Sequence, residues 1–145
     1  MVRKRKHSLD LKLVELEEGN FHLLVSGKID GVHVCHWIID TGASKSVFDV
    51  NQVDMYRPNH NPEQEIRSAG IGEGHIETSM GILENLSFGE LIESQFHVAL
   101  INFSHINELY SQFTDEEVHG LLGSDFLLTH QAVIDYRKLT LTLKG

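Results

Sequence analysis

Short runs in which apolar and polar residues alternate are the feature that most constrains the fold of this chain. Apolar residues at every second position predict β-strands with one buried face, and the Leu-Thr segment Leu139–Leu143 is the most regular case. Turn-forming residues separate the runs, as at Asp30-Gly31, a dipeptide that favours a tight hairpin. Many short strands with turns between them favour a barrel or a sandwich-like sheet over a parallel sheet with crossover helices. The sequence therefore predicts an all-β fold with one or two short helices.

The predicted strands share this alternation or a high content of β-branched and aromatic residues. They are residues 8–13, Phe21–Ile29, Val32–Ile39, Ile76–Phe88, Ser94–Ile101, Ala132–Tyr136 and Leu139–Leu143. The first three are expected to form a meander. Two prolines four residues apart predict a loop over residues 57–62, and helical spacing of apolar residues predicts a helix over residues 104–113. Ser124 is expected to cap a second short helix, Asp125–His130.

The size and charge of the chain limit the functions that it can have. Its 145 residues suffice for one domain with its own core, and no linker or internal repeat divides them. The net charge of −9 argues against nucleic acid as a partner, because phosphate binding needs clustered positive charge. The single cysteine excludes an internal disulfide framework.

Positive charge is concentrated at the N-terminus. Residues 1–7 contain four Lys and Arg residues and no acidic residue. This pattern predicts a basic, solvated N-terminal tail, with a targeting or anionic-surface tag as the alternative. The domain then spans residues 8–145. No apolar segment of signal-peptide type follows the basic residues, and no run approaches the ~18 apolar residues of a membrane helix. We therefore expect a cytoplasmic protein with no membrane partner.

The segment most informative about chemistry lies where a predicted strand ends. The apolar residues before Asp40 deliver this carboxyl group to the end of a buried strand. Thr41, Gly42, Ala43 and Ser44 follow, and Gly42 permits a sharp turn of the backbone. The alternative is a strand that ends in an ordinary Asx-turn.

Two further segments complete the pattern. About eighty residues downstream, Leu121, Leu122 and Gly123 again place two apolar residues and a glycine before a predicted short helix. Between the Asp40 segment and the Leu121-Leu122-Gly123 segment lies a glycine-rich stretch, which predicts a mobile hairpin tip. Its residues are Gly70, Ile71, Gly72, Glu73 and Gly74. In this order, the three segments resemble those of the retropepsin-like aspartic proteases, the single-domain family of retroviral type.

The resemblance covers the chain from about Gly27 to Leu143 and is closer to cellular and bacterial members than to viral ones. It implies a closed or partly open barrel of acid-protease type and an aspartic endopeptidase in which Asp40 is the catalytic residue. Thr41, Gly42, Ala43 and Ser44 would form the active-site loop around it. The stretch from Gly70 to Gly74 would be the flap that closes over substrate. Leu121, Leu122 and Gly123 would pack beside the loop.

Two positions depart from the viral pattern. Many viral members carry an ion pair between an Asp and an Arg at the positions of Ser44 and Ser124. Here both charges are absent together, so no buried charge is left unpaired.

The expected chemistry needs a second copy of the chain. Peptide hydrolysis by carboxyl groups uses two of them, which share a proton around one water. Asp-Thr-Gly occurs once, so activity implies a homodimer in which each subunit contributes Asp40. The expected partners are a second copy and a peptide or protein substrate, without a cofactor. Leu139–Leu143 is expected to contribute to the dimer, unless the N-terminal extension pairs with it. The alternative function is a non-catalytic module of the same fold that binds peptides or only dimerises.

The cluster His33-Val34-Cys35-His36 resembles a metal site. In a strand, however, His33 and Cys35 face one side and His36 faces the other, and zinc sites usually draw ligands from two segments. We therefore expect no metal there, and we expect Cys35 to behave as a small apolar residue. The other histidines are scattered, so we expect them at surface or hydrogen-bonded core positions. His75 is the exception, because it lies beside the glycine-rich tip.

Overall fold

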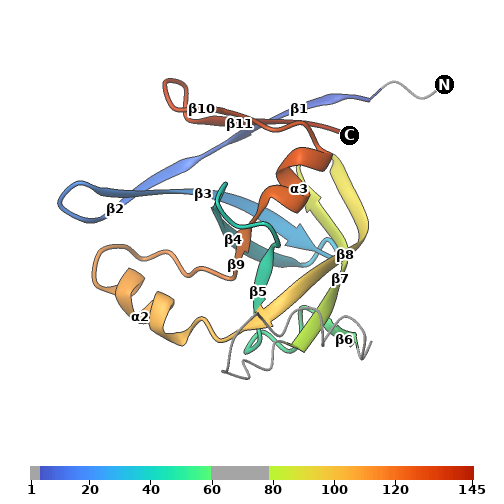
Figure 1. The fold of residues 1–145 in the computed structure, drawn as a ribbon, viewed down its shortest axis with the longest axis horizontal. Coiled ribbons are helices and arrows are strands. Elements are labelled where there is room, and N and C mark those ends of the chain that lie inside the picture. Colours follow the sequence, from blue (N-terminus) through green and yellow to red (C-terminus); the bar gives the residue numbers. More distant parts are fainter. Residues whose placement is uncertain (1–3, 60–78) are drawn as a thin grey trace.

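A closed barrel forms the body of the structure, a computed structural model that describes residues 4–59 and 79–145 (Figure 1). The strands in these residues are β1 (Lys6–Asp10), β2 (Lys12–Glu17), β3 (Asn20–Ile29), β4 (His33–Ile39), β5 (Val47–Asp49), β6 (Arg57–Asn59), β7 (Ser79–Phe88), β8 (Leu91–Ile101), β9 (Gly120–Leu122), β10 (Val133–Asp135) and β11 (Thr140–Lys144). The helices in the same residues are α2 (Ser104–Ser111) and α3 (Ser124–Thr129). Neither of these helices is long and apolar enough to cross a membrane.

The larger sheet runs in the order β2-β3-β4-β9-β5-β8-β7-β6, and an additional pairing between β3 and β7 closes it. The strands of the ring are therefore β3, β4, β9, β5, β8 and β7. The strands β2, β3 and β4 pair consecutively and antiparallel, so a meander is present, but its first strand is Lys12–Glu17 rather than the predicted residues 8–13. The prediction of a mainly β barrel with two short helices is also confirmed for the described residues.

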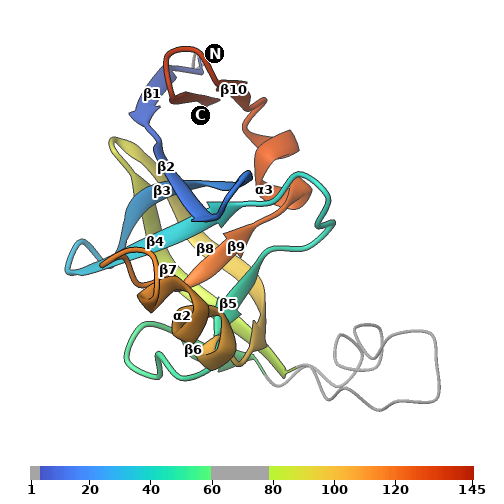
Figure 2. The same cartoon turned by 90° about the vertical axis from the view of Figure 1, so that its left-hand side faces the viewer.

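The smaller sheet holds the two ends of the chain together. Its order is β1-β11-β10, and Arg5 and Gly145 exchange backbone hydrogen bonds of 3.1 and 3.0 Å. Figures 1 and 2 both show this sheet at the end of the molecule opposite α2. Because β1 and β10 occupy the two edges of β11, this strand has no free edge for another chain. β11 therefore does not offer an edge for exchange between two subunits, and the expected contribution of Leu139–Leu143 to a dimer stays a prediction. The alternative, pairing with the N-terminal segment, is correct.

The N-terminal strands differ from prediction at both ends of the segment. β1 begins at Lys6, so the last two residues of the basic segment 1–7 belong to a strand. The single strand predicted for residues 8–13 is divided, because the chain passes from the smaller to the larger sheet at Leu11. The change of sheet alters which residues are buried: Leu13 is 41% exposed, whereas its neighbour Val14 is buried.

Trp37 lies at the centre of the core. Its side chain is fully buried, and its ring centroid lies 5.4 Å from that of Phe48 and 6.4 Å from that of Phe88. Aromatic side chains of this size contribute much of the free energy of a core. The ring also requires a glycine in β9, because a Cβ atom at Gly120 would lie 2.5 Å from it. A second apolar cluster, which includes Tyr110, joins α2 to the barrel.

Local turns and helix ends test the remaining predictions. Asp30 and Gly31 have φ angles of 53° and 67°, as a type I′ hairpin turn requires, so this prediction is confirmed. The predicted loop over residues 57–62 is wrong for its first half, because β6 lies there. Pro58 is tolerated in β6 because, among the residues that the structure describes, this strand is at the sheet edge and pairs with β7 alone. The predicted cap of the second helix is also wrong: Gly123 is the N-cap of α3, and Ser124 is its first residue.

Candidate active site

Asp40 stands directly after the last residue of β4. The strands β4 and β9 run parallel, with Ile39 opposite Leu122. The Asp40 N–H donates to the Leu122 carbonyl oxygen at 2.9 Å, so the pairing of the strands continues to the carboxyl-bearing residue. The Asp40 side chain is half-buried. Leu121 and Leu122 of β9 therefore lie beside the loop.

The chain turns sharply after Asp40. The Ala43 N–H donates to the Asp40 carbonyl oxygen at 3.2 Å, and the Gly42 N–H donates to Asp40 Oδ1 at 3.1 Å. The second bond is that of an Asx-turn, so this local geometry is present whether or not the residue is catalytic. Thr41 and Gly42 are exposed at the tip. In the part of the chain that the structure describes, Oδ2 of Asp40 has no hydrogen-bond partner, so this oxygen is available to a water or a second carboxyl group.

Gly123 brings the second predicted segment against this turn. A Cβ atom at this position would lie 2.7 Å from the Ala43 carbonyl oxygen and 3.0 Å from the carbonyl carbon of Lys45. Both atoms belong to the backbone and cannot move aside easily. The Ser124 N–H donates to the same Ala43 oxygen at 2.7 Å. The absence of a side chain at Gly123 thus allows two distant segments to form one unit.

Asp125 and Ser46 fasten these two segments, and the sequence analysis assigned no role to either residue. The Asp125 carboxylate accepts hydrogen bonds from the Ser46 N–H at 3.0 and 3.1 Å and from Ser46 Oγ at 2.7 Å. Ser46 Oγ in turn accepts from the Gly123 N–H at 2.9 Å. Ser46 is fully buried, so these contacts are shielded from water. The sequence signal for this contact is the position of Asp125, an acidic residue in the first turn of the helix that follows Gly123.

The remaining predicted site residues fall in different places. Ser44 is exposed, and the bridge between the two segments is made by Asp125 and Ser46 rather than by Ser44 and Ser124. The predicted flap, Gly70 to Gly74, lies outside the described residues, as does His75.

Cys35 lies inside the barrel, away from the surface. Its side chain is fully buried, and the Trp37 Nε1–H donates to its Sγ at 3.1 Å. Burial raises the pKa of the Cys35 thiol to about 11, which keeps the thiol protonated. The prediction that Cys35 acts as a buried apolar residue is confirmed.

An apolar pocket of about 390 Å³ opens beside Asp40. Its walls come from β3, β4, β9 and α2, and from Asp40 itself. The lining residues are His22, Ile38, Ile39, Asp40, Ile106, Leu109, Tyr110 and Leu121. Binding sites commonly have such a volume and an apolar lining with few polar groups. The candidate site therefore combines an accessible carboxyl group with a cavity suited to an apolar group.

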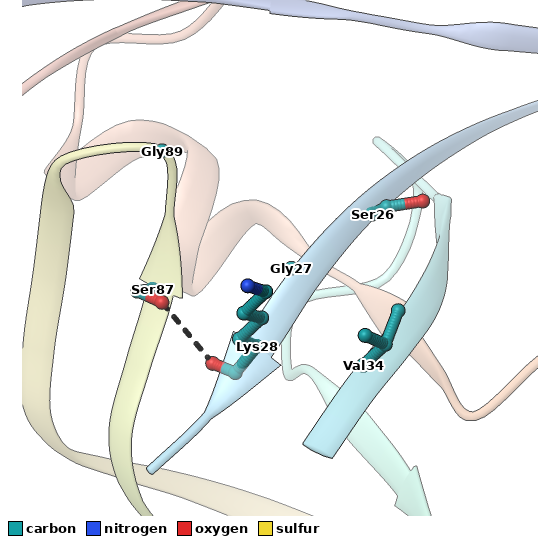
Figure 3. A pocket seen from close by; sticks show the side chains of 6 residues that line it. All are labelled: Ser26, Gly27, Lys28, Val34, Ser87 and Gly89. Carbon is teal, nitrogen blue, oxygen red and sulfur yellow. Dashed lines mark hydrogen bonds between the residues drawn. The ribbon is translucent and has the colours of Figure 1, made fainter. Parts of the chain in front are cut away.

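A second hollow, of about 250 Å³, lies near the start of β4 (Figure 3). Its lining residues are Ser26, Gly27, Lys28, Val34, Ser87 and Gly89. Figure 3 shows the Ser87 hydroxyl donating to the Lys28 carbonyl oxygen across the β3–β7 seam, at 3.4 Å. Val34 precedes Asp40 by six residues, which is roughly 20 Å along an extended strand. None of these lining residues carries a carboxylate, imidazole or thiol group, so this hollow offers no group suited to carboxyl-based catalysis.

Comparisons with known proteins agree with this geometry. Residues 25–126 match the model of a family described as aspartyl protease. A retropepsin-like aspartic protease from Rickettsia conorii has a TM-score of 0.50 and 13% sequence identity to this chain, over 99% of this chain and 95% of its own. The retroviral protease-like domain of Ddi1 from Leishmania major also has a TM-score of 0.50, with 17% identity over 83% of this chain and 86% of its own. No curated protein sequence matches the chain significantly.

These comparisons establish different things. At such low identity the two solved structures are evidence for the fold alone. The family model covers more than half of the chain and includes both Asp40 and the Leu121-Leu122-Gly123 segment. The resemblance that the sequence motifs indicate is therefore confirmed: the chain belongs to the aspartyl protease family, and its fold is similar to that of retropepsin-like proteases.

Proposed function

We propose that this protein is an aspartic endopeptidase that activates water with two Asp40 carboxyl groups, one from each subunit of a homodimer. The observation that carries the proposal is the setting of Asp40. Its backbone is fixed by the Leu122 carbonyl oxygen, one carboxylate oxygen is held by the Gly42 N–H, and the side chain is only half-buried. A carboxyl group that is held in place and open to solvent meets the geometric requirement for general acid–base catalysis.

The reaction needs a second carboxyl group close to the first. Asp125 is hydrogen-bonded to the active-site segment, but its carboxylate is engaged by Ser46. Asp-Thr-Gly occurs only once in the chain. A second copy related by a two-fold axis supplies an identical Asp40 without any further residue.

The surface around Thr41 supports a contact between two copies there. Thr41 lines a shallow hollow together with residues of α3, including Ser124 and Leu128. Leu128 is 80% exposed, so an apolar residue is available at this surface for contact with a second copy. Since β11 has no free edge, we place the subunit contact at this surface, where it brings the two Asp40 turns together.

In the proposed reaction the two carboxyl groups share one proton, because two negative charges at short distance repel each other. The ionised group takes a proton from water as the water oxygen bonds to the peptide carbonyl carbon, while the protonated group donates its proton to the carbonyl oxygen. In the second step one hydroxyl of the intermediate returns its proton to the ionised group. The other carboxyl group protonates the nitrogen as the C–N bond breaks, which restores the starting state.

Cleavage of a proteome-derived peptide library, read by mass spectrometry, tests this function. Asp40→Asn preserves the shape of the side chain and an acceptor for the Gly42 N–H. We therefore expect a folded dimer by sedimentation and a loss of cleavage of about 10²–10⁴-fold. Asp54→Asn, at an exposed aspartate outside the site, is the matched control. Equal cleavage by the Asp40→Asn variant would refute the proposal. A folded wild-type protein that binds peptides but cleaves none would instead favour the non-catalytic module.

A further inference from the structure

We propose that Ser26, His36 and Glu116 form a second hydrolytic site on the outer face of the barrel, in which Ser26 is a nucleophile toward small carboxylic esters. This site is separate from the Asp40 loop, and it does not depend on the proposed peptidase function. It lies at the hollow drawn in Figure 3, of which Ser26 is a lining residue.

Pairing of β3 with β4 brings the serine and the histidine together on the outer face of the barrel. Ser26 lies directly opposite His36 in this antiparallel pair, so both side chains are on the same side of the sheet. The neighbours of the histidine, Cys35 and Trp37, are fully buried in the core, which leaves His36 on the outside. Ser26 is exposed, and Figure 3 shows its hydroxyl group directed toward β4. A substrate can therefore reach this hydroxyl group.

The hydroxyl and imidazole groups are within hydrogen-bond distance of each other. Ser26 Oγ and His36 Nδ1 lie 2.7 Å apart. A serine hydroxyl is a weak nucleophile by itself, and a neighbouring general base activates it by taking its proton. An imidazole that accepts at Nδ1 is such a base, so the pair meets the first geometric requirement for attack by Ser26.

A carboxylate faces the other nitrogen of the imidazole ring. His36 Nε2 lies 3.6 Å from Glu116 Oε2, and the two side chains are 26% and 24% exposed. This distance is longer than a hydrogen bond, but it lets the carboxylate stabilise the positive ring that forms when His36 takes a proton. The carboxylate also favours the tautomer with its proton on Nε2, which leaves Nδ1 to accept from Ser26. Nucleophile, base and orienting carboxylate thus stand in the order of a serine hydrolase triad.

Contacts on both sides hold Glu116 in place and in its charged form. Lys12 Nζ donates to Glu116 Oε1 at 2.5 Å, and this hydrogen bond lowers the pKa of the Glu116 carboxyl group. The Glu116 N–H donates to Thr114 Oγ1 at 3.2 Å. Three residues further on, the His119 N–H donates to the His36 carbonyl oxygen at 2.9 Å, and the His36 N–H donates to His119 Nδ1 at 3.0 Å. The segment that carries Glu116 is therefore bonded to β4 beside the base.

The hollow beside Ser26 determines the class of substrate. Its volume of about 250 Å³ is below the about 300–1,000 Å³ of usual ligand sites, so it suits a short acyl group. Val34 gives it an apolar wall, and Lys28 is the one charged residue among its described lining residues. Lys28 forms no ion pair within the part of the chain that the structure describes. Its ammonium group is therefore available to stabilise the negative oxygen that forms when an ester carbonyl is attacked.

The reaction at this site proceeds through an acylated serine. Ser26 Oγ bonds to the ester carbonyl carbon as its proton passes to His36 Nδ1, and the carbonyl π electrons move to the oxygen. The carbonyl group then re-forms, the C–O bond to the alcohol breaks, and His36 gives its proton to the leaving oxygen. Water removes the acyl group by the same route: His36 takes a proton from the water and returns one to Ser26 Oγ. The ester and water become a carboxylic acid and an alcohol, and no further reactant is needed.

A fluorophosphonate probe, which bonds to activated serine hydroxyls with loss of fluoride, tests the nucleophile in the folded wild-type protein. Peptide mass spectrometry should locate the probe on Ser26, and Ser26→Ala should lose it. His36→Gln should slow the labelling by about 10²-fold or more. Ser94→Ala, at an exposed strand serine outside the hollow, is the matched control and should label as the wild type does. Labelling of Ser26 no faster than in the urea-unfolded chain would refute the site.

Hydrolysis of p-nitrophenyl acetate tests Glu116, a positioning residue that acts through His36 and does not touch the substrate. Glu116→Gln keeps the shape of the side chain but removes the charge that faces the imidazole ring. We expect kcat to fall at least about tenfold while KM stays within about twofold. Glu117→Gln, at the next and exposed position, is the matched control. An unchanged kcat in Glu116→Gln would show that the three residues do not act together and would overturn the proposal.

The Asp40→Asn variant separates this site from the proposed peptidase. It should lose peptide cleavage and keep both the labelling of Ser26 and the hydrolysis of p-nitrophenyl acetate. Ester hydrolysis by a wild-type protein that cleaves no peptide would support the second site even though the peptidase proposal had failed. Loss of ester hydrolysis in Asp40→Asn would assign this activity to the Asp40 loop and would refute the second site.

Discussion

Removal of the Asp125 carboxylate should uncouple the two loops of the candidate site. In an Asp125→Ala variant, the Ser46 N–H and hydroxyl lose the acceptor to which they now bind at 2.7–3.1 Å. Ser46 is fully buried, so water cannot easily replace the lost partner. Asp125→Asn keeps the shape of the side chain and one acceptor oxygen but removes the charge. Comparison of the two variants therefore separates the effect of the charge from that of the lost acceptor.

The size of the effect follows from the state of the two donors. A hydrogen bond to a charged acceptor contributes about 1.5–3 kcal/mol, and a buried donor left unpaired costs about 1–3 kcal/mol. Asp125 itself is only half-buried, so these contributions are at the lower end of their range. We therefore expect Asp125→Ala to lower the free energy of unfolding by about 3–4 kcal/mol and Asp125→Asn by about 1–2 kcal/mol. Such a loss is a large part of the ~5–15 kcal/mol that stabilises a typical domain.

Urea unfolding followed by tryptophan fluorescence measures these differences, since Trp37 lies in the core. Ser44→Ala, at an exposed position of the same loop, is the control and should change the free energy by less than about 0.5 kcal/mol. The turn that positions Asp40 should also loosen, so cleavage at low urea should fall more in Asp125→Ala than the unfolded fraction explains. A loss of stability below about 1 kcal/mol in Asp125→Ala would refute the claim that this carboxylate fastens the loops.

Three further predictions concern neighbouring parts of the molecule. Gly123→Ala should destabilise the protein by about 2 kcal/mol or more in urea unfolding, because its Cβ would meet the Ala43 carbonyl oxygen at 2.7 Å; an unchanged midpoint would contradict this close approach. Burial lowers the pKa of His119, so the unfolded chain binds a proton more readily and stability should fall as the pH decreases below about 6.5. His119→Asn, which keeps an acceptor for the His36 N–H, should reduce the difference between urea midpoints at pH 5.5 and 7.5, and an undiminished difference would show that other groups cause it. Truncation after Tyr136 removes the fully buried Leu141 and Leu143 and should abolish the thermal transition in circular dichroism, whereas a folded, truncated monomer would show that β11 is dispensable.

Local patterns made part of the site predictable from the sequence. The apolar run before Asp40 predicts a buried strand, and the structure has β4 there, ending one residue before the aspartate. The hairpin at Asp30-Gly31 is equally local, because its positive φ angles suit these two residues. Such features depend on residues that are adjacent in sequence.

Features that depend on distant residues were not predictable in this way. The carboxylate of Asp125 is bonded to Ser46, which lies 79 positions away, and no short pattern links the two. The alternating leucines near Leu11 predict a single strand, but pairing with two different sheets divides it. Pro58 indicates a loop, and only its place at the sheet edge explains why a strand is allowed. In each case tertiary pairing outweighs the local preference.

Helix α3 connects the candidate site to the smaller sheet, and this connection explains why β11 is occupied within the chain. Near its start, Asp125 binds Ser46 of the active-site segment. At its end, both ring nitrogens of the buried His130 face acceptor oxygens: Nδ1 lies 3.0 Å from the Lys144 carbonyl oxygen, and Nε2 lies 2.5 Å from Glu93 Oε1. A helix of six residues thus spans from the Asp40 loop to β11 and β8. Pairing of β1 and β10 with β11 supports this helix from within the same subunit. Because β1 and β10 cover both edges of β11 within the subunit, this strand does not pair with a second copy in this arrangement, which favours the proposed subunit contact at the exposed surface around Thr41.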